Sequence, residues 1–111
     1  MFTGTLKREN SPLSYEFTNA VFVVESFNYD VRRAEMDVRV IGFADEYAYN
    51  AYKAKLEKNE YHDLERSMVL NRSFSVKKAD VDAAVDTLSG AGMVAAIEAV
   101  LQATEPIFQN A

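Results

Sequence analysis

The single histidine is the side chain best suited to catalysis. His62 stands beside Asp63 in a polar segment, and a histidine with a neighbouring carboxylate can act as a general base. The chain has no cysteine and no second histidine, so a zinc site lacks its usual ligands and a thiol nucleophile is excluded. No nucleophile motif accompanies His62. We therefore interpret it as an exposed histidine in a loop. We predict no catalytic residues and a protein that is not an enzyme.

Three aspartates near the start of a predicted helix are the alternative metal ligands. Asp80, Asp82 and Asp86 offer carboxylates at helical spacing, which Mg²⁺ or Ca²⁺ would accept. The glycine and closing glutamate of a calcium loop are missing from this segment. Carboxylates also stabilise a helix N-terminus electrostatically, with Asp80 as its N-cap. We predict this simpler role, with no metal and no cofactor.

Residues 89–92, Ser-Gly-Ala-Gly, have the glycine content of a phosphate-binding loop. They lack the Gly-Lys-Ser/Thr ending of that motif, and no strand directly precedes them. Two glycines within a helical pattern indicate a break between two helices, with Gly90 as a left-handed cap, or a bend in one helix.

Aromatic side chains form the remaining candidate site. Tyrosines and lysines alternate in one stretch: Tyr47, Tyr49, Tyr52, Lys53, Lys55, Lys58 and Tyr61. Such a stretch can stack nucleic-acid bases or sugars, but tyrosines are also enriched at protein interfaces. We favour a protein interface, and predict contacts through Tyr47, Tyr49 and the C-terminal Phe108.

The periodicity of the chain predicts an α+β fold. A central antiparallel hairpin is expected from two amphipathic strands joined by a short polar turn. Along the first of them, alternation puts Val21, Val23, Phe27 and Tyr29 on one face and Phe22 with Val24 on the other. The predicted elements are strands at about 20–29 and 34–43, a helix at about 44–56, further strand candidates at 13–17 and 68–76, and C-terminal helices at about 79–89 and 92–103, packed on the sheet.

Length and composition favour one domain over residues 1–111. The chain is 49% hydrophobic and 26% charged, which are ordinary globular values. Residues 1–12 form either a short strand or an extended arm, and 105–111 an apolar tail; each either packs on a neighbouring subunit or frays. The net charge of −5 argues against nucleic-acid binding. The longest apolar run, 20–24, is too short to span a membrane, so we expect a cytoplasmic product.

Residues 13–76 resemble small virion proteins of tailed bacteriophages, found in the tail, baseplate or neck. The likeness rests on Tyr-Glu-Phe-Thr-Asn-Ala-Val-Phe-Val-Val-Glu-Ser-Phe at 15–27, a basic turn, and Met-Asp-Val-Arg-Val-Ile-Gly-Phe at 36–43. The resemblance implies a multi-copy structural protein that contacts copies of itself or neighbouring virion proteins. It implies no catalytic residues. The helical C-terminus, 79–103, departs from the pattern.

Two other functions remain open on the sequence. An acidic binding module or inhibitor would engage a basic partner surface through the net negative charge. A small enzyme would assemble its active site between subunits around His62.

Overall fold

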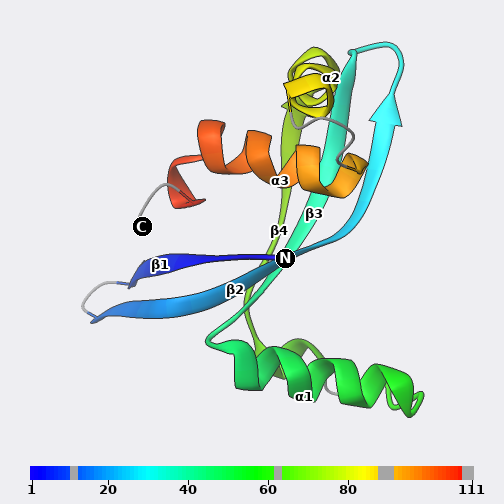
Figure 1. Ribbon diagram of the computed structural model, residues 1–111. Coiled ribbons are helices and arrows are strands. Elements are labelled where there is room, and N and C mark those ends of the chain that lie inside the picture. The colour runs from blue at the N-terminus through cyan, green and yellow to red at the C-terminus, as the bar shows by residue number, and fades with distance from the viewer. Residues whose placement is uncertain (11–12, 62–63, 88–91, 109–111) are drawn as a thin grey trace.

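The computed structural model describes residues 1–10, 13–61, 64–87 and 92–108. These residues form a four-stranded antiparallel sheet in the order β1-β2-β3-β4, with helices inserted after β3 and added after β4 (Figure 1). The predicted α+β fold and its central hairpin are confirmed. The elements are β1 (Phe2–Asn10), β2 (Leu13–Asp30), β3 (Glu35–Phe43), α1 (Glu46–Glu57), the 3-10 turn η1 (Leu64–Ser67), β4 (Met68–Lys77), α2 (Lys78–Thr87), α3 (Met93–Thr104) and the 3-10 turn η2 (Pro106–Phe108).

One face of the sheet carries the main hydrophobic core. Along β3, Met36, Val38 and Val40 are buried at every second position, because successive side chains of a strand point to opposite faces. The C-terminal helices cover this face. In α3 the buried residues recur at helical spacing, and α2 adds Val81. The strands supply β-branched and aromatic side chains, and the helices supply the complementary apolar stripe.

Phe2, near the start of the chain, and Phe108, in η2, belong to this core. β1 pairs with β2, and its Phe2 and Leu6 are buried. Of the two alternatives for the N-terminal segment, residues 2–10 therefore form a strand of the sheet and not an extended arm. The Phe108 ring lies 5.2 Å from that of Phe2, 5.0 Å from Phe22 and 5.1 Å from Phe74. The expected tail is likewise corrected for its described residues 105–108, because η2 folds back onto the sheet; residues 109–111 lie outside the described part of the chain. Aromatic rings bury a large apolar area, which explains why β1 and η2 pack inward.

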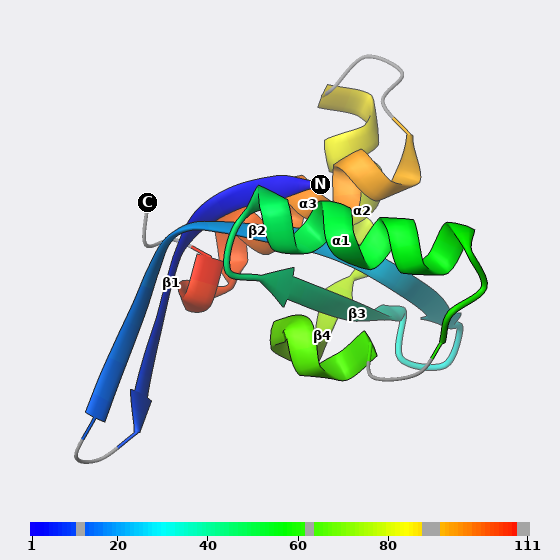
Figure 2. The same cartoon turned by 90° about the horizontal axis from the view of Figure 1, so that it is seen from below.

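Helix α1 covers part of the opposite face. Its N-cap Asp45 accepts a hydrogen bond from the Ala48 N–H at 2.8 Å. At its C-terminus, Asn59 adopts a left-handed φ of 58°, and the Glu60 N–H donates to the Lys55 carbonyl as in a Schellman motif. The helix has no buried residue of its own, but it shields the buried ring of Phe43. Figure 2 shows α1 lying across the sheet, with the β1–β2 hairpin extending away from the rest of the fold.

Candidate interaction surface

Strand β2 is paired on different sides along its length. Its residues 13–22 pair with β1, and its residues 21–30 pair with β3. Residues 23–30 therefore have a strand on one side only, among the residues that the structure describes. Figure 1 shows this half of β2 running along the margin of the sheet toward the turn with β3. Such an edge presents backbone N–H and C=O groups that another strand can bind.

A β-bulge at Glu25 sets which side chains lie along this edge. Val24 pairs with Val40 but Ser26 pairs with Arg39, so Glu25 has no direct partner in β3. An extra residue of this kind switches the alternation of faces beyond it. The prediction that Val21 and Val23 share a face with Phe27 and Tyr29 was therefore wrong. Phe27 and Tyr29 share the face of Phe22 and Val24, which carries the main core.

These two aromatic side chains lie on the core face but are not covered. Phe27 is 38% exposed and Tyr29 is 48% exposed, although their partners Val38 and Met36 are buried. Val31, in the turn that follows, is 76% exposed. Together, Phe27, Tyr29 and Val31 make up what we call the β2 edge patch. The patch leaves one side of the hydrophobic core open to solvent.

The turn beyond the patch is held by a charged network. The Asp30 carboxylate accepts hydrogen bonds from the backbone N–H groups of Arg32 and Arg33, and from the Arg33 Nε at 3.0 Å. The hydrogen bond from the Arg33 side chain is the main reason why the pKa of Asp30 lies below its usual value. Arg33 also donates to Asp37 at 3.3 Å, and its carboxylate neighbours raise its pKa.

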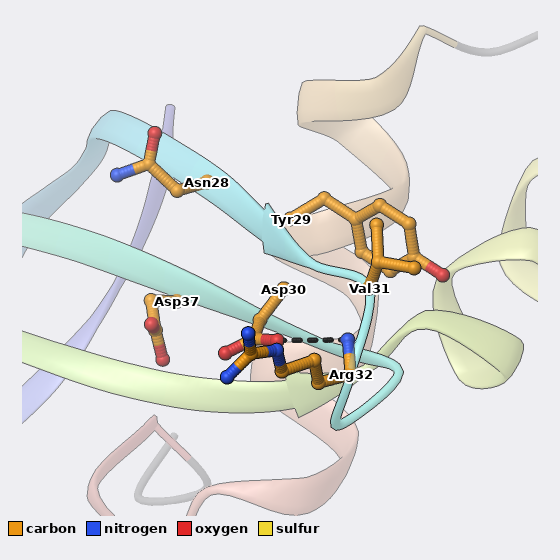
Figure 3. Close-up of a pocket in the computed structure, with 6 residues that line it drawn as sticks. All are labelled: Asn28, Tyr29, Asp30, Val31, Arg32 and Asp37. Atoms are coloured by element: carbon orange, nitrogen blue, oxygen red, sulfur yellow. Dashed lines mark hydrogen bonds between the residues drawn. The ribbon is translucent and has the colours of Figure 1, made fainter.

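A surface pocket of about 540 Å³ lies at this turn (Figure 3). Its lining combines the patch residues Tyr29 and Val31 with Asn28, Asp30, Arg32 and Asp37. Figure 3 shows the Asn28 and Tyr29 side chains leaving β2 toward opposite sides, with the Tyr29 ring beside Val31. Of the polar side chains in this lining, the Asp30 and Asp37 carboxylates are already paired with Arg33.

Helix α2 fixes the turn against the body of the protein. The Lys78 N–H donates to the Ala34 carbonyl at 3.0 Å, and Ala34 has a left-handed φ of 52°. The Lys78 ammonium lies 5.7 Å from the centre of the Tyr29 ring and also pairs with Asp82. Tyr29 is thus held in place on one side while its other side remains exposed.

The predicted interface residues do not form one surface. Tyr47, on α1, is 83% exposed and free to contact a partner. Tyr49 is half-buried, with its ring 5.5 Å from that of Phe43 and the Lys53 ammonium 4.8 Å from its centre. Phe108 is corrected to a core residue, because it is 9% exposed and packs among three phenylalanine rings. Aromatic content alone could not separate a core ring from a surface ring.

The other candidate sites lie outside the described residues or are paired within the fold. His62 and residues 88–91 lie outside the described part of the chain. Helix α2 begins at Lys78, so Asp80 lies in its first turn and not at its N-cap, and Asp82 pairs with Lys78. Among the described residues, no three His, Cys, Asp or Glu side chains lie close enough together to hold a metal ion.

Sequence reasoning missed the β2 edge patch. The available signal was Glu25, a charged residue in the middle of an otherwise apolar alternation. A bulge interrupts the alternation in this way, because its extra residue shifts the side chains that follow to the opposite face from the one that strict alternation predicts. The free edge itself has no local signal, since it depends on how far β1 extends along β2.

None of the helices in the described part of the chain is both long and apolar enough to cross a membrane. Comparison with protein-family models, with curated proteins and with solved structures found no match to this chain.

Proposed function

We propose that this protein is a structural assembly protein, present in multiple copies, that acts through contacts with other protein subunits. The observation that carries this proposal is the unpaired edge of β2 at residues 23–30 with its exposed row of Phe27, Tyr29 and Val31. Unpaired edges with exposed apolar side chains are prone to strand addition, so monomeric proteins usually cover or charge them. Here Ser26, Phe27, Asn28 and Tyr29 carry no charge.

The physical basis of the contact is burial of aromatic side chains together with backbone pairing. Strand addition gives affinity through main-chain hydrogen bonds and specificity through alternate side chains. Tyrosines and other aromatics dominate the energy of many protein interfaces. Residues 23–30 supply both the free backbone groups and the aromatic side chains. The Asp30 network and α2 hold this segment in place.

The tailed-phage virion is the setting that we propose for this assembly. The support is the resemblance of residues 13–76 to small tail, baseplate and neck proteins, which function as repeated structural subunits. A binding module that uses the acidic surface is the competing function. It would engage a basic partner as a monomer, with an affinity that falls as salt is added.

Light scattering coupled to size exclusion, over a concentration series, tests the proposal. We expect the wild type to form a discrete oligomer or to grow in mass with concentration. The doubly substituted Phe27→Ser, Tyr29→Ser variant should remain a folded monomer, whereas the control Tyr47→Ser, equally aromatic and exposed on α1, should behave as the wild type. A wild type that stays monomeric at its highest soluble concentration would overturn the proposal, and so would an oligomer that the double variant leaves unchanged.

A further inference from the structure

We propose that the strand bound by the β2 edge is the same segment of a second copy of this chain. The two copies would pair antiparallel over residues 26–30, about a two-fold axis at Asn28. This inference rests on the proposed assembly function and names its partner and register. The two four-stranded sheets would then join into one continuous sheet.

The order of residues along the edge is chemically self-complementary. Residues 26–30 read Ser-Phe-Asn-Tyr-Asp, with an asparagine at the centre, an aromatic on each side and a polar residue beyond each aromatic. Antiparallel pairing about Asn28 places Phe27 of each copy opposite Tyr29 of the other. Cross-strand aromatic pairs of this kind stabilise a sheet. Both pairs fall on the core face, so each copy covers the rings that the other leaves exposed.

The polar face of the edge is compatible with the same register. Ser26 of each copy faces Asp30 of the other, and Asn28 faces Asn28, so hydroxyl, carboxylate and amide groups can hydrogen-bond across the axis. No two like charges are opposed. The Asp30 carboxylate is already compensated by Arg33 within its own copy, at 3.0 Å.

The neighbouring register about Phe27 is less favourable. Pairing about Phe27 places Tyr29 opposite the bulged Glu25 and Asp30 opposite Val24, which leaves one charge against an aromatic and another against an aliphatic side chain. The bulge at Glu25 ends regular pairing on one side, and the turn that starts at Val31 ends it on the other. Residues 26–30 are therefore the stretch over which both strands remain regular, with Asn28 at its midpoint.

Single cysteines can test the register, because the chain contains no cysteine of its own. Directly opposite residues in an antiparallel pair have Cα atoms about 4.5–5.5 Å apart, within the range that a disulfide spans. The Asn28→Cys variant places its cysteine opposite itself across the axis. The Ser26→Cys variant places its two cysteines four positions out of register, about 13 Å apart at about 3.3 Å per residue. Both positions are exposed on the same strand and face.

We expect mild oxidation, or a short bis-maleimide, to convert Asn28→Cys into a covalent dimer at concentrations where the wild type associates. Ser26→Cys should remain uncrosslinked, as should Ser75→Cys, an exposed control on β4. If the wild type associates by light scattering but Asn28→Cys fails to crosslink, or the two controls crosslink equally fast, the register is overturned and the assembly function stands. If the wild type does not associate at all, the assembly function fails and the inference fails with it.

Discussion

Phe27 lies directly opposite Val38 in the β2–β3 ladder, yet Val38 is completely buried while 38% of Phe27 is exposed. The difference arises from the strands on either side. Val38 stands between β2 and β4, whereas Phe27 has β3 on one side and no strand on the other among the described residues. A single copy thus completes its core around β3 and leaves it incomplete along β2, which is the physical basis for the assembly account.

Insertion of one alanine between Ser26 and Phe27 should be far more damaging than replacement of Glu25. Ser26 pairs with Arg39 and Phe27 with Val38, so one more residue at this point would turn Phe27 away from the core face and bring Asn28 onto it. A polar group placed against the core without a partner costs about 1–3 kcal/mol, so the insertion should lower the free energy of unfolding by at least ~1 kcal/mol. Glu25→Ala should cost under ~0.5 kcal/mol, because its contact with Arg39 is an exposed ion pair at 3.8 Å. Urea unfolding of both variants measures the difference, and equal stabilities would contradict the face switch.

The aromatic cluster predicts that Phe108 is a structural residue. Phe108→Ala should lower the free energy of unfolding by about 3–5 kcal/mol, because it removes a buried ring in contact with three others. Tyr47→Ala, at an exposed aromatic position, should change the same quantity by less than ~0.5 kcal/mol. Thermal or urea unfolding compares the two, and a Phe108→Ala variant as stable as the wild type would mean that η2 does not pack on the sheet.

Gly42 should not tolerate a side chain. A Cβ atom there would lie 2.9 Å from the Leu70 Cβ and 3.1 Å from the Phe22 Cδ1, inside van der Waals contact. We expect Gly42→Ala to destabilise the fold by about 1–3 kcal/mol through overpacking. Gly4→Ala is the matched control, since its Cβ would meet the Phe22 Cε2 at 3.8 Å, an ordinary contact. Similar stability for the two variants would contradict the close packing of β3 against β2 and β4.

The Asp30 network predicts a contribution to stability that depends on pH. Hydrogen bonds from Arg33 hold the pKa of Asp30 below its usual value in the folded state. A depressed pKa means that the carboxylate stabilises the fold above its unfolded pKa, and that this contribution is lost as pH falls through the folded value. Asp30→Asn should therefore show a shallower loss of stability than the wild type on acidification below about pH 4. Identical pH profiles would show that the network does not bias the folding equilibrium.

The strands and helices were predictable because their signals are local. Alternation along β3 and helical spacing in α3 each arise within one element, so the sequence alone places Val38 and Ile97 on buried faces. The cap of α1 at Asp45 follows from a single residue type for the same reason.

The interaction surface was not predictable because it depends on long-range pairing. The exposure of Phe27 is set by where β1 stops pairing with β2, and the burial of Phe108 by contacts with Phe2, more than a hundred positions away in the chain. The bulge at Glu25 changes the face of every later residue in β2, which strict alternation cannot anticipate. Tertiary contacts, which the sequence does not encode locally, decided these positions.

Amide hydrogen exchange along β2 tests the central claim most directly. The exchange rates of the backbone N–H groups at residues 26–30 should be measured in dilute and in concentrated protein. The account predicts that their protection increases with concentration, while protection in α1, remote from the edge, stays constant. Unchanged exchange at residues 26–30 in a sample that light scattering shows to be associated would contradict the claim that the open edge of β2 is the assembly surface.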